Sequence, residues 1–236
     1  MIKVKSHYKK IVGMFQQLTG SKSMWQVFQD VIEVIALAIQ NSCEVFPDRM
    51  ESNEKKYLNT IKKYSDDEIK LIVEIYCQIV DMLEENPYQD LLGDLYMQLD
   101  MGSSALGQFF TPYNISEAMA KMSLEKNIVL DCIEKNGYVK INEPCIGGGA
   151  NIIGSLSALH DLGVNWQEKC VVVGQDLSYV TATMAYVVLS LLGCQAVIKV
   201  ADTLTRPYTS FWNEIKSKSL IWYTPMFVLY GADRRV

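Results

Sequence analysis

The feature that most constrains this chain is a run of three glycines, Gly147–Gly149, directly behind an apolar stretch that ends in Glu143 and Pro144. Residues 138–142 have the composition of a strand, and residues 150–156 have that of a helix start. Strand, glycine turn and helix are typical of open α/β sheets that hold a nucleotide-like ligand at the carboxyl ends of their strands. The glycine run alone fits a plain turn equally well, so its neighbours must decide.

The neighbouring sequence alternates between strand-like and helix-like stretches. Strands are predicted at 138–142, 170–173, 196–200 and 220–223, with helices at about 150–162 and 178–192. This alternation predicts a parallel, doubly wound α/β sheet. A further helix, capped by Asn114 or Ser116, is expected to run to about Leu124.

The first 104 residues instead show helical periodicity. Residues 25–39 carry a broad apolar face, and Ser65 and Glu68 have the spacing of a capping box. The helix that this box opens is predicted to turn one set of side chains inward: Ile69, Ile72, Val73, Tyr76, Ile79, Val80 and Leu83. The small residues of 101–107 suggest a linker. We therefore expect a helical region at 1–104 and an α/β domain at 105–236.

Composition limits the function. With 236 residues, 49% of them hydrophobic and 21% charged, the chain can build a packed core. Its net charge of −5 gives no support to free-standing DNA binding. Six cysteines without paired spacing and two histidines argue against a disulfide framework and a metal site. No signal peptide or long apolar run is present, so we expect a cytoplasmic protein with no membrane partner.

Acidic residues follow three successive predicted strands. Glu143 ends the first, Asp176 the second and Asp202 the third. A single one could be a solvated loop residue. Because the carboxyl ends of parallel strands share one edge, three such carboxylates beside a glycine turn predict a ligand site there.

At these positions the chain resembles the methylase subunits of type I restriction–modification systems, within the gamma-type DNA adenine-N6 methyltransferases. Residues 90–96 resemble the segment before their cofactor region, and Gly107–Pro112 is similar to their G-Q-F-F-T-P stretch, which contacts the methionine moiety of S-adenosylmethionine. Glu143–Gly149 stands where they have D-P-A-C-G-S-G, with Glu for Asp. Asp176 matches their ribose-binding acid, and Asp202–Leu204 matches their D-S-L element beside the adenine of the cofactor.

The resemblance covers residues 90–204 well and implies a Rossmann-like methyltransferase sheet that binds S-adenosylmethionine. Carried over residue by residue, it assigns these cofactor-binding positions: Phe110, Thr111, Pro112, Glu143, Gly147, Gly149, Asp176 and Asp202. Such a cofactor requires no metal and no protein nucleophile.

The chain departs from the family at the catalytic motif. Where the family has N-P-P-F or N-P-P-Y after strand four, this sequence has Thr224, Pro225, Met226 and Phe227. The resemblance implies that Thr224 and the Pro225 carbonyl orient the adenine amino group, while Phe227 stacks on the flipped base. A threonine hydroxyl is shorter than an asparagine amide and lacks its planar geometry. The sheet is also expected to be incomplete on the C-terminal side, with an edge covered by residues 227–231 or a partner.

Three hypotheses follow. The first is an S-adenosylmethionine-dependent DNA adenine-N6 methyltransferase of a restriction–modification system, which reaches DNA through a specificity or partner subunit. The second is a catalytically degenerate, cofactor-binding regulatory or structural subunit. The third, a Rossmann dehydrogenase, is disfavoured because Glu143 and Pro144 precede the glycines where a G-x-G-x-x-G turn is required. A homo-oligomer formed through the open sheet edge is a further expectation.

Overall fold

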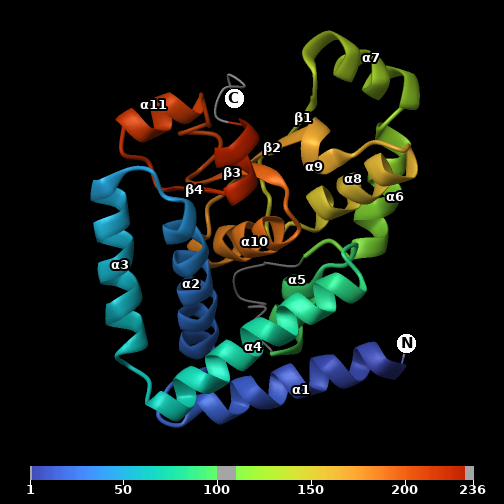
Figure 1. Ribbon diagram of the computed structural model, residues 1–236. Helices are drawn as coiled ribbons and strands as arrows, with labels where there is room; N and C mark the ends of the chain where they lie inside the picture. The colour runs from blue at the N-terminus through green and yellow to red at the C-terminus, as the bar shows by residue number, and fades with distance from the viewer. Residues whose placement is uncertain (1, 100–109, 232–236) are drawn as a thin grey trace. The chain divides into compact units, whose positions relative to one another are not determined.

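The computed structural model describes residues 2–99 and 110–231 and divides the chain into two compact units (Figure 1). The first unit comprises Met1–Pro87 and Leu91–Phe109, and the second comprises Tyr88–Asp90 and Phe110–Val236. The predicted linker and the predicted boundary at residues 104 and 105 lie outside the described residues, so both stay predictions.

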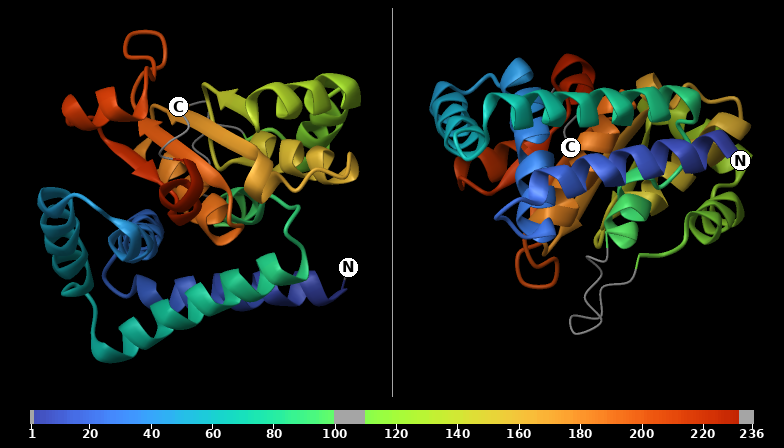
Figure 2. Two further views of the ribbon diagram at one scale, coloured as in Figure 1. Left: turned by 45° about the horizontal axis from the view of Figure 1, so that its top comes forward. Right: turned by 90° about the horizontal axis from the view of Figure 1, so that it is seen from below.

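The described part of the first unit is built from helices: α1 (Ile2–Thr19), α2 (Met24–Cys43), α3 (Pro47–Ile61), α4 (Asp66–Glu85) and α5 (Leu91–Gln98). α1 lies beside α4 and also contacts α2 (Figure 2). Large side chains from four of these helices are fully buried and form the core: Phe15, Phe28, Ile32, Ile75, Ile79 and Tyr96. The apolar stripes of the sequence therefore serve packing, as their helical spacing predicts.

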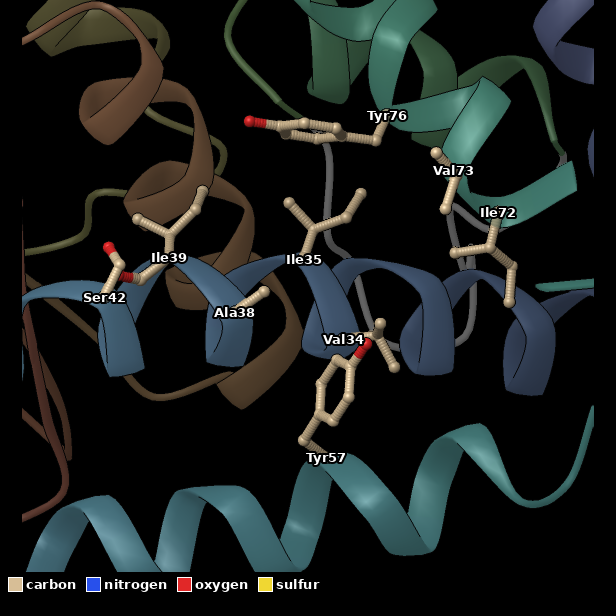
Figure 3. A pocket seen from close by; sticks show the side chains of 9 residues that line it. All are labelled: Val34, Ile35, Ala38, Ile39, Ser42, Tyr57, Ile72, Val73 and Tyr76. Atoms are coloured by element: carbon tan, nitrogen blue, oxygen red, sulfur yellow. The ribbon is translucent and has the colours of Figure 1, made fainter. Parts of the chain in front are cut away.

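The start of α4 confirms the predicted capping box. The Ser65 hydroxyl accepts a hydrogen bond from the Glu68 backbone N–H, and the Glu68 carboxylate accepts one from the Ser65 N–H at 2.7 Å. One predicted inward position is wrong, because Val73 is 55% exposed whereas Ile75 is fully buried. Val73 lies at the margin of the buried stripe and lines an apolar pocket of about 330 Å³ with side chains of α2 and Tyr57 (Figure 3).

The second unit holds a four-stranded sheet in the order β1-β2-β3-β4. Its strands are β1 (Val139–Glu143), β2 (Cys170–Asp176), β3 (Gln195–Val200) and β4 (Ile221–Tyr223). β1, β2 and β3 are parallel as predicted, with Glu143 opposite Gly174 and Asp176 opposite Val200. The expectation of a wholly parallel sheet is wrong for β4, which pairs antiparallel with β3.

The helices of the second unit surround this sheet: α6 (Tyr113–Ser123), α7 (Lys126–Asn136), α8 (Ala150–Asp161), α9 (Trp166–Lys169), α10 (Tyr179–Leu191) and α11 (Phe211–Lys216). One turn of π-helix, η1 (Phe227–Gly231), follows β4 and contacts β3. α8 packs on β1 and on α6, while α10 packs on β2 and β3. α6 begins after Pro112, so the predicted caps Asn114 and Ser116 lie inside the helix.

Within the described ranges, no helix is long and apolar enough to cross a membrane. The six cysteines are free thiols. No cluster of three or more potential metal ligands occurs among the residues that the structure describes.

Candidate functional site

The glycine turn after β1 requires the conformational freedom of glycine at two positions. Gly147 has a φ of +54° and Gly149 a φ of +101°, both in the left-handed region that side chains disfavour. A Cβ atom on Gly147 would also lie 3.3 Å from Cε1 of Phe110. The turn therefore brings bare backbone close to the Phe110 ring and leads directly into the first turn of α8.

Glu143, the last residue of β1, is half-buried and held at both carboxylate oxygens. Oε1 accepts a 3.1 Å hydrogen bond from the Cys145 backbone N–H, and Oε2 accepts one of 3.1 Å from Nδ2 of Asn151. An ionised carboxylate offers about four acceptor sites. These two bonds fix its orientation and leave acceptor capacity for an ammonium or hydroxyl group.

Asp176, the last residue of β2, links two strand ends. Its Oδ2 accepts a 2.8 Å hydrogen bond from the Gly147 backbone N–H, and its Oδ1 accepts one of the same length from the Ser178 N–H. Because each oxygen retains a second lone-pair direction, the carboxylate can still accept bonds from vicinal hydroxyls. The predicted acid and the predicted glycine turn thus meet at one edge of the sheet.

Asp202 lies two residues beyond β3 at the same edge. Its Oδ1 accepts a 2.9 Å hydrogen bond from the Leu204 N–H. This backbone bond, with a side-chain bond from Thr205, lowers the pKa of the Asp202 carboxyl below its ordinary value. The Thr203 hydroxyl donates a 2.6 Å bond to the Pro144 carbonyl, which joins this loop to the loop after β1. The three predicted acids are therefore held by one connected set of loops.

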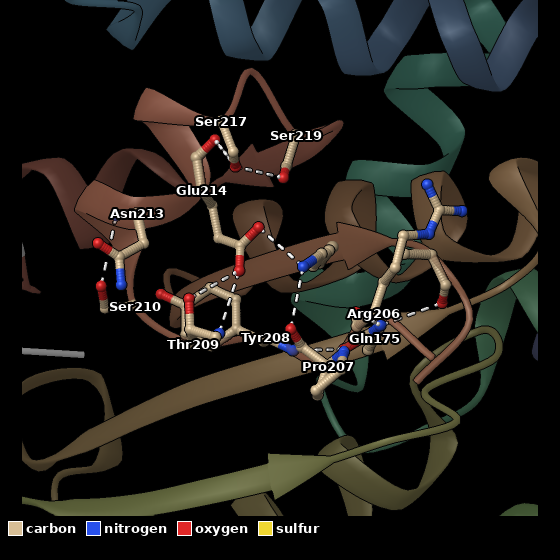
Figure 4. A network of polar contacts seen from close by, with 12 residues as sticks. Gln175, Arg206, Pro207, Tyr208, Thr209, Ser210, Asn213, Glu214, Ser217 and Ser219 are labelled. Atoms are coloured by element: carbon tan, nitrogen blue, oxygen red, sulfur yellow. Dashed lines mark hydrogen bonds and ion pairs between the residues drawn. The ribbon is translucent and has the colours of Figure 1, made fainter. Parts of the chain in front are cut away.

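A buried glutamine that the sequence did not single out organises the loop after β3. Nε2 of Gln175 donates to the carbonyls of Ala201 (3.1 Å) and Arg206 (2.9 Å), and its Oε1 accepts from the Tyr208 N–H at 3.0 Å (Figure 4). No local signal distinguishes this residue, because all three partners lie more than 25 positions along the chain.

The same loop is braced by an ion pair. Nζ of Lys199 lies 2.8 Å from Oε2 of Glu214, with the two side chains 8% and 3% exposed, and it also donates to the Pro207 carbonyl. Oε1 of Glu214 accepts the Thr209 backbone N–H at 3.0 Å (Figure 4). Burial acts to raise the pKa of Glu214, but the bonds from Lys199, Ser219 and Thr209 outweigh it and leave the pKa below its ordinary value.

The predicted segment before α6 is described from Phe110 onwards, and Gly107–Phe109 lie outside the described residues. Phe110 is half-buried against Gly147, whereas Thr111 and Pro112 are exposed. The structure thus brings Phe110 to the glycine turn. Two leucines that follow site acids are exposed as well, Leu177 at 72% and Leu204 at 93%, and they provide apolar surface beside the carboxylates.

The structure does not bring the predicted catalytic residues to this edge. Since β4 is antiparallel, its end lies beside the start of β3, and the Thr224 N–H donates to the Ala196 carbonyl. The fully buried Thr224 hydroxyl donates a 2.6 Å bond to the Cys194 carbonyl and accepts one of 2.9 Å from the Ala196 N–H. These bonds occupy the acceptor that was expected to orient an adenine amino group.

Phe227 is also committed to packing. Its ring is 1% exposed and lies 5.1 Å from the ring of Phe211, centroid to centroid. Pro225 is half-buried between this core and the surface. Thr224 therefore lies at the opposite, amino-terminal end of β3, and Phe227 packs in the core, while the catalytic roles of Thr224, Pro225 and Phe227 stay predictions.

Comparison with known proteins bears on the same part of the chain. The family model described as N-6 DNA Methylase matches residues 87–226, more than half of the sequence. No curated protein shows a significant match to the chain. The matched range begins directly before Tyr88–Asp90, the short segment that belongs to the second unit. It includes the glycine turn, all three acids and β4.

Proposed function

The chain belongs to the N-6 DNA methylase family. We propose that it is a DNA adenine-N6 methyltransferase of a restriction–modification system and that it binds S-adenosylmethionine at the carboxyl edge of β1, β2 and β3. The observation that carries this proposal is the bond from the Gly147 N–H to Asp176, which combines a glycine turn and an acid in one site. The assignment to a restriction–modification system rests on the resemblance of the sequence to type I methylase subunits.

The residues present fit the cofactor. Its ammonium group and ribose hydroxyls are hydrogen-bond donors, and Glu143 and Asp176 are carboxylates with acceptor capacity to spare. The absence of a side chain at Gly147 lets the Phe110 ring lie against the glycine turn, where the ring can contact the cofactor. The exposed Leu177 and Leu204 offer apolar surface to a flat purine. When bound, S-adenosylmethionine supplies an electrophilic methyl group that an adenine amino nitrogen can take directly.

The role of this chain's residues is binding and orientation. The two carboxylates would fix the cofactor at two points, and holding reactants in place is the main source of acceleration in a direct transfer. The backbone bonds that hold Glu143 and Asp176 position these carboxylates before any ligand arrives. Such preorganisation reduces the ordering cost of binding.

A second candidate is a cofactor-binding subunit that does not itself transfer methyl groups. It is favoured by the burial of Thr224 and Phe227, since neither side chain faces the acids in this structure. On this alternative the cofactor site is retained for assembly or regulation. The two candidates share cofactor binding and differ in transfer.

For DNA, we propose that recognition requires a specificity or partner subunit. The formal net charge of −5 leaves little capacity to release counterions from a phosphate backbone. Anisotropy with a fluorescent duplex should show weak binding by the chain alone at physiological salt. Submicromolar, salt-sensitive binding would contradict this proposal.

The proposal as a whole is tested in two steps. Calorimetry and thermal unfolding with S-adenosylmethionine come first, and a saturating ligand at about a hundredfold excess over Kd should stabilise the fold by about 2.7 kcal/mol. Labelled cofactor with adenine-containing DNA comes second, with and without a partner subunit. Cofactor binding with label in DNA supports the methyltransferase, and binding with no label under any condition supports the second candidate. No stabilisation at millimolar cofactor would reject both.

A further inference from the structure

Two helices that flank the glycine turn meet at unusually close range. α6 follows the Phe110–Pro112 segment, and α8 follows the glycines. A Cβ on Gly154 of α8 would lie 2.9 Å from the backbone N of Glu117 and equally close to the carbonyl carbon of Ser116. Side chains essentially never approach backbone so closely, so only glycine permits this contact. It brings the backbone of α6 within reach of polar side chains on α8.

One polar chain crosses this seam and ends at the site. The Ser116 hydroxyl, 1% exposed, donates a 2.7 Å hydrogen bond to Oδ1 of Asn151. Nδ2 of the same amide donates to Oε2 of Glu143 at 3.1 Å. Asn151 is therefore the sole side chain seen to bond the Glu143 carboxylate among the described residues.

The carboxylate of Glu143 determines which end of the Asn151 amide faces it. A carboxylate only accepts hydrogen bonds, so the amide presents its NH₂ group to Glu143 and its Oδ1 to Ser116. The Ser116 hydroxyl donates to that oxygen and holds the amide in place. Ser116 thus acts through Asn151 and not on Glu143 directly.

We propose that Ser116 and Asn151 are positioning residues that aim the Glu143 carboxylate at the ammonium group of the cofactor's amino-acid part. This inference rests on the proposed function and adds to it a division of labour. Asp176 is held by two backbone N–H groups and serves the hydroxyls of the ribose, whereas Glu143 is held by one backbone N–H and by this side-chain relay and serves the positive charge. A carboxylate is the group that suits a fixed cation.

These separate roles predict that substitutions in the relay weaken the binding of one ligand and not of another. S-adenosylhomocysteine carries the amino-acid part, whereas 5′-methylthioadenosine has the same adenosine and sulfur without it. Asn151→Ala should weaken S-adenosylhomocysteine about tenfold, and Ser116→Ala about threefold, because a bond to a charged group is lost or loosened. Binding of 5′-methylthioadenosine should be unchanged in both. Asn151→Asp has nearly the same shape but places a second negative charge beside Glu143. It should therefore also change the affinity for S-adenosylhomocysteine and leave that for 5′-methylthioadenosine unchanged.

Ser157→Ala is the matched control. The Ser157 hydroxyl donates a 3.0 Å bond to Oε1 of Glu117 across the same seam, with no link to Glu143. It should leave the ratio of the two affinities at the wild-type value. Calorimetry gives both affinities, and circular dichroism with thermal unfolding shows that each variant is folded.

The possible results distinguish a failure of the proposed function from a failure of the positioning role of Ser116 and Asn151. If the wild type binds neither ligand, the proposed function fails and the inference falls with it. If the wild type binds both and the Asn151 variants weaken both equally, or neither, the relay is structural and the inference alone is wrong. A change confined to S-adenosylhomocysteine, absent in Ser157→Ala, supports it.

Discussion

The backbone N–H of Gly147 donates a 2.8 Å hydrogen bond to Oδ2 of Asp176, a residue 29 positions further along the chain. The bond exists because β1 and β2 are parallel neighbours whose carboxyl ends lie at the same edge. It joins a turn that requires glycine to an acid positioned for ribose hydroxyls. Most of what we expect of this site depends on that link.

Replacing Asp176 by alanine should weaken S-adenosylmethionine binding about 10- to 100-fold, because charge-assisted hydrogen bonds of about 1.5–3 kcal/mol each are lost. It should also lower stability, since the N–H groups of Gly147 and Ser178 lose their acceptor. Calorimetry measures the first effect and urea unfolding the second. Asp131→Ala, an exposed acid of α7, is the control. An unchanged affinity in Asp176→Ala would show this acid to be structural only.

Substitutions at two glycines separate the effect of backbone strain on stability from the effect of an added side chain on cofactor binding. Gly147 and Gly137 both have positive φ, +54° and +83°, so alanine at either should cost about 1–2 kcal/mol of stability. A Cβ at 137 meets nothing within 4 Å, whereas one at 147 meets the Phe110 ring at 3.3 Å. Only Gly147→Ala should therefore weaken cofactor binding as well. Equal affinities in the two variants would argue against a ligand beside Gly147.

These positions also show what local sequence could predict. β1, β2, β3 and the capping box of α4 followed from composition and short-range spacing, which neighbouring residues determine. The direction of β4 did not, because a three-residue strand carries no local signal for which partner it pairs with. The roles of Asn151 and Gln175 escaped notice for the same reason. Their partners are distant in sequence, although an asparagine just after the three glycines could have prompted attention.

The buried Lys199–Glu214 pair predicts a pH dependence of stability. The pKa of Glu214 is lowered in the folded state, so its contribution is fully present above the pKa of the unfolded chain and is lost as pH falls through that value to the folded one. Glu214→Gln should remove this part of the acid sensitivity. At neutral pH it should cost about 3–5 kcal/mol, because Lys199 stays buried without a counter-charge.

Thermal or urea unfolding between neutral pH and pH 3 measures both effects. Glu74→Gln, from the half-exposed pair with Lys10, is the control and should change little. If Glu214→Gln and the wild type lose stability in parallel on acidification, the Glu214 pair does not contribute to the pH dependence.

The last prediction concerns Phe227, for which the two candidate functions predict different effects of substitution on methyl transfer. In this structure its ring packs on Phe211 in the core, so Phe227→Leu and Phe211→Leu remove similar contacts from the same cluster. Both should lower stability by about 1–2 kcal/mol, and neither should change cofactor affinity. Methyl transfer to DNA, expressed per folded molecule, should respond to the two substitutions alike.

The opposite result would have a definite meaning. If Phe227 leaves the core to stack on an extruded adenine, Phe227→Leu should lower transfer by about 10- to 100-fold, since base stacking contributes about 1–3 kcal/mol. Phe211→Leu would then retain activity. Thr224→Asn extends the comparison. In the buried site between Cys194 and Ala196, the longer, planar amide cannot reproduce both bonds of the Thr224 hydroxyl, so it should destabilise the fold without raising transfer. A faster Thr224→Asn enzyme would instead show that this segment reaches the cofactor edge during catalysis, and that the arrangement of β4 described here is a resting one.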